Sequence, residues 1–114
     1  MAPYELRGMT VKQLSEIRKA MTADVYRWEI EKLPMEKQKE SAWMLHLTQT
    51  ALLKMRNAEL SAIRDQLLVN EADLTTGTSQ LQQVLDDLTK TEHILTQVAG
   101  FLKIVARIVP LVLG

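Results

Sequence analysis

Between residues 10 and 32, apolar side chains recur every three or four positions. The members of this stripe are Leu14, Ile17, Met21, Val25 and Trp28. Such spacing places all of them on one face of a helix. Thr10 followed by Gln13 is a capping-box pattern at its start, and Pro34 cannot continue its hydrogen-bond ladder. We therefore predict a helix over about 10–32, joined by a short turn at Pro34 to a second helix.

Leucine then recurs at every seventh position, without interruption, from Leu53 to Leu102. A repeat of this kind predicts helices with coiled-coil-like heptads. Several positions three residues after these leucines are β-branched, which favours assemblies of more than two strands. The residues predicted to form this heptad face, which would mediate oligomerisation, are Leu53, Leu60, Ile63, Leu67, Leu74, Leu81, Val84, Leu88, Leu95, Val98, Leu102 and Val105.

The stretch Thr-Thr-Gly-Thr-Ser at residues 75–79 has poor helix propensity. Gly77 can end a helix, and Ser79 with Gln82 repeats the capping-box pattern. With breaks at Pro34 and Gly77, we predict an all-α hairpin or bundle of two to three long amphipathic helices, over about 10–32, 35–74 and 79–109. Because the leucine register runs through the stretch, the alternative is a continuous helix over 35–109 that is kinked near Gly77.

The 114 residues have room for a single helical domain. We expect an irregular leader over 1–9, an amphipathic helical body over 10–97 and an apolar, cationic tail over 98–114. The leader contains Pro3 and Gly8 but no apolar run. We therefore expect no cleaved secretory signal, and hence synthesis in the cytoplasm.

In the tail, 12 of 17 residues are apolar, and Lys103 and Arg107 are its charged residues. On a helix, its polar and small residues would form one narrow stripe, whereas a surface helix has a wide polar face. We therefore expect the tail to be buried in protein or in lipid. As a helix it would reach about 25 Å, less than the ~30 Å hydrocarbon core of a bilayer. The predicted membrane-contact residues are Phe101, Leu102, Lys103, Ile104, Arg107, Ile108 and Leu111.

The charged residues are 14 basic and 14 acidic, so the net charge is zero and a nucleic-acid partner is not expected. The chain has no cysteine, and its two histidines, His46 and His93, stand in no metal-binding or catalytic motif. Its four glycines are scattered and form no phosphate-binding loop. We therefore predict that the protein is not an enzyme and has no metal, cofactor or small-molecule substrate.

These patterns indicate a protein that needs either copies of itself or a membrane to cover its apolar surface. The main hypothesis is a self-associating, non-enzymatic helical protein whose tail contacts or inserts into a membrane, as a pore-forming or membrane-anchoring assembly. The alternative is a soluble oligomeric structural or adaptor protein, such as a virion or scaffold component. In that case the tail helix would form the core of the oligomer.

Overall fold

The computed structural model describes residues 1–112, which form six α-helices and no strand. The helices are α1 (Pro3–Met21), α2 (Asp24–Glu31), α3 (Met35–Asn57), α4 (Leu60–Val69), α5 (Glu71–Val84) and α6 (Thr91–Val105). The all-α prediction is therefore confirmed. The prediction of two to three long helices is wrong, as is the alternative of one continuous helix from residue 35.

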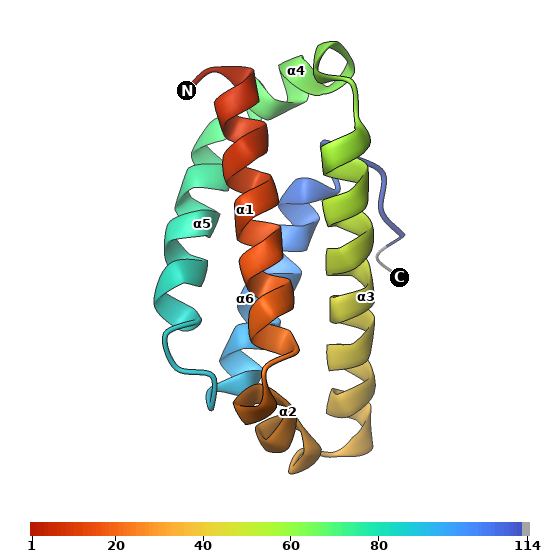
Figure 1. The fold of residues 1–114 in the computed structure, drawn as a ribbon, viewed down its shortest axis with the longest axis vertical. Coiled ribbons are helices and arrows are strands. Elements are labelled where there is room, and N and C mark those ends of the chain that lie inside the picture. The colour runs from red at the N-terminus through yellow and green to blue at the C-terminus, as the bar shows by residue number, and fades with distance from the viewer. Residues whose placement is uncertain (113–114) are drawn as a thin grey trace.

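Four of the helices, α1, α3, α5 and α6, lie side by side as a bundle (Figure 1). The whole molecule measures 44 × 26 × 18 Å. In this view α1 is in front, α6 behind, α5 on the left and α3 on the right. Both α1 and α6 pack against α3 and α5. The short helices lie at the two ends, with α2 at the lower end and α4 crossing the upper end.

The most thoroughly buried helix is α6, and its position explains the composition of the tail. Its apolar residues fill the space between α3 and α5, and Ile108 and Val109 beyond its end are buried as well. A helix covered on most sides needs apolar residues on most sides. Most of the apolar residues from 98 to 109 are therefore covered by the chain's own helices, whereas Val112 is exposed.

The expected irregular leader is wrong, because α1 begins at Pro3. Proline is favoured in the first turn of a helix, where its missing N–H is not needed. The Glu5 carboxylate accepts a hydrogen bond of 2.9 Å from the backbone N–H of Ala2, which satisfies a donor at the helix start. Residues 3–9 thus belong to the bundle.

The predicted helix over 10–32 is divided at Thr22 and Ala23 into α1 and α2. The Thr22 hydroxyl donates to the backbone carbonyl of Arg18 at 2.8 Å, at the C-terminal end of α1. The division changes which face of the second part is buried. Val25 and Trp28 are exposed, although the stripe predicts them inside, and Tyr26 is buried in their place.

The break predicted at 75–79 is wrong, since Gly77 lies inside α5. A Cβ atom at this position would lie 2.9 Å from Cδ1 of Phe101 on α6. The glycine therefore permits a close approach of α5 and α6 and does not end a helix. The chain reverses instead at residues 85–90, where the Asp87 carboxylate accepts hydrogen bonds from the N–H and the hydroxyl of Thr89.

The predicted helix over 35–74 is likewise divided, at 58–59 and at Asn70, and Pro34 is the residue that precedes α3. The leucine repeat thus crosses the ends of α3, α4 and α5. It follows no single helix, because each new helix turns its own apolar side toward the same core.

Candidate interaction surface

Among residues 1–112, no group of three or more His, Cys, Asp or Glu side chains is placed to hold a metal ion. His46 and His93 are both exposed and lie on different helices, α3 and α6. None of the described helices is both long and apolar enough to cross a membrane.

The residues predicted for the oligomeric heptad face lie mostly in the core of this one chain. Eight of them are buried: Ile63, Leu67, Leu74, Leu81, Leu95, Val98, Leu102 and Val105. Leu60, Val84 and Leu88 are half-buried and pack against that core. Of the twelve, Leu53 alone is exposed, with 61% of its surface accessible.

The predicted membrane-contact residues also divide between core and surface. Phe101, Leu102 and Ile108 are buried. Ile104 and Leu111 are half-buried, and Lys103 and Arg107 are exposed. The Arg107 guanidinium donates to the Asp73 carboxylate at 2.9 Å and to the Asn70 side-chain oxygen at 3.2 Å. This cation therefore ties the end of α6 to the start of α5.

An exposed apolar surface that the sequence does not predict runs along the outside of α3. Met35 and Leu53 are 62% and 61% exposed, and Trp43 between them is 37% exposed. Since 18 residues make five full helical turns, Met35 and Leu53 lie on one line along the helix. We define the outer α3 face by its exposed residues on that side: Met35, Lys39, Ala42, Trp43, His46, Gln49 and Leu53.

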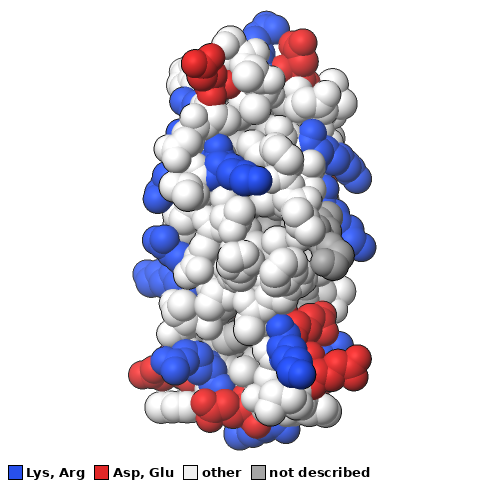
Figure 2. All heavy atoms as spheres, turned by 90° about the vertical axis from the view of Figure 1, so that its right-hand side faces the viewer, with Lys and Arg blue, Asp and Glu red and all other residues white. Residues whose placement is uncertain are grey.

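The charges of this side of the molecule are unevenly placed. Figure 2 shows acidic side chains gathered at its two ends, while the middle is largely uncharged and bordered by Lys and Arg. From residue 41 to residue 58 the chain has no acidic residue, and Lys54 and Arg56 are its basic ones. The rings of Trp43 and His46 stack near the centre, with centroids 5.3 Å apart. The outer α3 face is thus apolar at its two ends and aromatic near its centre, with Lys39 and Gln49 between these parts and a cationic border.

One flank of this face is fixed by the chain after α6. The Lys54 ammonium donates to the backbone carbonyl of Pro110 at 2.6 Å. Leu53 also borders an apolar hollow of about 400 Å³, whose other walls include Ile63, Ile108 and Val109. The exposed leucine therefore stands beside a depression and not on a uniformly convex surface.

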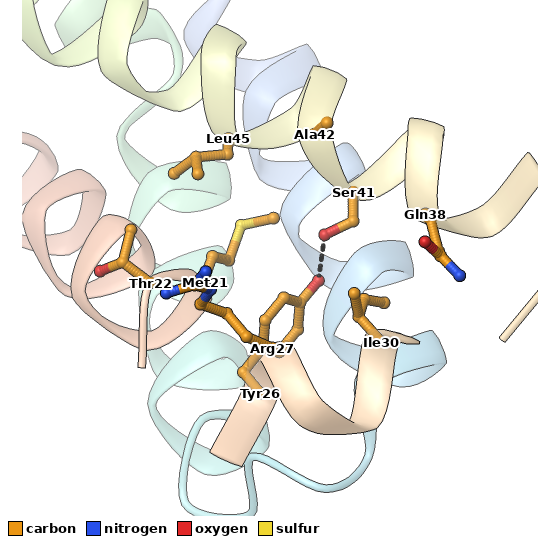
Figure 3. A pocket seen from close by; sticks show the side chains of 9 residues that line it. All are labelled: Met21, Thr22, Tyr26, Arg27, Ile30, Gln38, Ser41, Ala42 and Leu45. Atoms are coloured by element: carbon orange, nitrogen blue, oxygen red, sulfur yellow. Dashed lines mark hydrogen bonds between the residues drawn. The ribbon is translucent and has the colours of Figure 1, made fainter. Parts of the chain in front are cut away.

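The other flank contains a cavity of about 360 Å³ between the end of α1, α2 and α3 (Figure 3). Its walls are mostly apolar, and inside it the hydroxyls of Tyr26 and Ser41 share a hydrogen bond of 2.7 Å. Burial raises the pKa of Tyr26 above its ordinary value, and the bond to Ser41 opposes that shift. This buried pair fastens α2 to α3.

The side-chain amide of Gln38 strengthens the same junction, because it donates to the backbone carbonyls of Glu31 and Leu33. These carbonyls come from the end of α2 and the turn that follows, which have lost their intrahelical partners. The α2–α3 turn is consequently held rigidly, and with it the Met35 end of the outer α3 face.

No protein-family model, no curated protein and no solved structure matches the chain.

Proposed function

We propose that this protein is a non-enzymatic structural or adaptor protein that acts by self-association through the outer α3 face. The observation that carries the proposal is the group of large apolar side chains exposed on the outside of α3: Met35 and Leu53 lie on one line five turns apart, and Trp43 lies between them on one flank. Single exposed apolar residues are ordinary, but several on one side of a helix in a folded domain are typical of a contact surface.

The free energy gained by burying these apolar side chains is sufficient for association. Full burial of one large apolar side chain contributes about 1.5–3 kcal/mol. Met35, Trp43 and Leu53 are already partly covered, so each would contribute less, but a two-fold contact would bury each of them twice. Aromatic residues and methionine are also enriched in the cores of protein interfaces. We therefore expect weak to moderate affinity, governed by these side chains.

Sedimentation velocity over a range of protein concentrations tests the proposal. The wild type should form an oligomer, and Leu53→Ser should shift the equilibrium strongly toward monomer. Val69→Ser is the matched control, since Val69 is 77% exposed on α4 and outside the outer α3 face. It should associate like the wild type. A wild type that stays monomeric at high concentration, or a Leu53→Ser variant that associates unchanged, would contradict the proposal.

Membrane contact through the tail is a second candidate function. It is supported by the sequence after Glu92, which has no acidic residue, and by the apolar character of α6. Because Phe101 and Leu102 are buried in the bundle, this function requires α6 to leave its place between α3 and α5. Flotation with anionic vesicles at neutral pH tests it: protein that remains at the bottom of the gradient excludes the membrane role.

A further inference from the structure

We propose that the outer α3 face is self-complementary. Two copies of the chain pair through it with their α3 helices antiparallel, and the two-fold axis crosses the contact at the level of residue 44 along the helix. The inference rests on the proposed self-association and specifies its geometry. Three sets of residues on the outside of α3 carry it: the apolar ends, the small and aromatic centre, and two opposite charges on one flank.

The apolar ends are placed symmetrically. Met35 and Leu53 each lie nine residues from position 44, on the same line along α3. An antiparallel partner therefore sets Met35 of one copy against Leu53 of the other, and the two-fold axis repeats the contact. A parallel pairing about the same helix would place Met35 on Met35 and Leu53 on Leu53.

The centre of the face allows close approach. Ala42 and His46 lie two residues on either side of position 44, so antiparallel pairing places each opposite the other. Ala42 is small and exposed, and it leaves room for the backbones of two helices to approach. Trp43 lies one residue from the axis on one flank of the face, so the two-fold axis places the indoles of the two copies on the same flank at mid-height of the contact.

The charges favour the same orientation. Glu36 and Lys54 are 18 residues apart, so both lie on one flank of α3, the flank that also carries Trp43. Antiparallel pairing sets Glu36 of each copy near Lys54 of the other. Among the described residues Glu36 belongs to no ion pair, and Lys54 donates to a carbonyl and not to a carboxylate. Parallel pairing would place like charges together, and it would align the two helix dipoles unfavourably.

Such a contact closes on itself. A two-fold interface uses the same patch on both copies, so assembly through it stops at two chains. A membrane surface or a different protein on the same face would show neither the pairing of Glu36 with Lys54 nor a limit of two copies. Charge-reversal variants of Glu36 and Lys54 therefore distinguish a second copy of the chain from a membrane or a different protein.

The test uses Glu36→Lys, Lys54→Glu and the double variant in sedimentation velocity at low salt. Each single variant faces like charges twice in its own dimer, and its dissociation constant should rise at least tenfold. The double variant, and an equimolar mixture of the two single variants, should return to within about threefold of the wild type. Glu16→Lys on α1 is the control and should not change association. Thermal melting of each variant should verify the fold.

The outcomes separate this inference from the broader proposal. A monomeric wild type contradicts both. A wild type that associates and depends on Leu53, but whose single charge variants are not restored by mixing or by the double change, contradicts the antiparallel pairing alone. A stable assembly larger than two chains through this face contradicts it as well.

A distance measurement gives a second criterion. The chain has no cysteine, so a nitroxide label at Asn57→Cys, an exposed site, is unique. Asn57 lies 13 residues from position 44, and antiparallel pairing should place the two labels about 40 Å apart along the helices. Labels within about 20 Å of each other would indicate parallel helices and overturn the proposal.

Discussion

At the scale of single residues, Gly77 shows how a packing requirement can resemble a helix break. Alanine at this position would gain about 0.5–1 kcal/mol of helix propensity. Its Cβ would, however, lie 2.9 Å from a ring carbon of Phe101, which is buried and cannot swing away. Overpacking of a core contact costs about 1–3 kcal/mol. We therefore expect Gly77→Ala to lower the free energy of unfolding by about 0.5–2 kcal/mol in urea titrations.

The chain supplies matched controls for this substitution. Gly8 in α1 and Gly100 in α6 are also helical and exposed, and an added Cβ would meet nothing within 4 Å. Gly8→Ala and Gly100→Ala should each raise the free energy of unfolding by about 0.5–1 kcal/mol. If all three substitutions stabilise the protein equally, the close approach of α5 and α6 at Gly77 is wrong.

Tyr26 provides a residue-scale prediction in alkaline solution. Because the folded state raises the pKa of Tyr26 above its ordinary value of 10.0, the unfolded chain loses this proton first as the pH rises. The contribution of this pKa difference to the free energy of unfolding is fully present below pH 10 and is lost as the pH rises through the folded-state pKa. Tyr26→Phe should therefore flatten the decline of the melting temperature above pH 10.

At neutral pH the same substitution should cost about 1–3 kcal/mol, because it leaves the buried Ser41 hydroxyl without its partner. Tyr4→Phe is the control, since Tyr4 is exposed at the start of α1. It should change neither the neutral stability nor the alkaline decline. An alkaline melting profile that is identical in the wild type and Tyr26→Phe would refute the role given to burial.

At the scale of elements, α6 links the fold most directly to the tail. Leu102 is fully buried, and Leu102→Ala should lower the free energy of unfolding by about 2–5 kcal/mol. The adjacent Lys103 is exposed, and Lys103→Ala should change it by less than about 0.5 kcal/mol. Chemical denaturation followed by circular dichroism compares the two. Similar effects of both substitutions would show that α6 does not fill the core.

The element scale also shows what the sequence can and cannot predict. The apolar spacing over 10–32 and the leucine repeat are enough to predict the all-α class. The sequence does not predict the short helices α2 and α4, because their boundaries at Thr22 and at Ala58 lack the proline or glycine that marks a helix end. The leucine repeat predicts a seam between long helices, although buried leucines of successive short helices give the same pattern.

The outer α3 face was harder to predict than the fold. Apolar residues occur all around α3, since its inner side faces the core and its outer side carries Met35, Trp43 and Leu53. Periodicity alone cannot tell which of two apolar sides is covered. The one available signal was Leu53, which begins the leucine repeat, but its exposure follows from where α3 ends and α4 begins.

At the scale of the whole molecule, the apolar tail poses a choice between a closed bundle and an open, membrane-bound form. If α6 reaches a membrane, it does so only when the bundle opens, and opening becomes easier as the bundle is destabilised. Gly77→Ala weakens the packing of α5 on α6 without changing charge or adding an exposed apolar side chain. It should therefore increase dye leakage from anionic vesicles several-fold over the wild type.

A substitution that stabilises the bundle should reduce dye leakage. Gly8→Ala stabilises the bundle from α1, far along the chain from α6, and should reduce leakage below the wild-type level. The same helix cannot fill the core and enter lipid at once. If the tail is membrane-active, dye leakage should therefore be higher in the less stable Gly77→Ala and lower in the more stable Gly8→Ala than in the wild type. Leakage that is equal in all three proteins would place any membrane contact on the folded surface, where the Trp43 and Lys54 side of α3 is the exposed aromatic and cationic region.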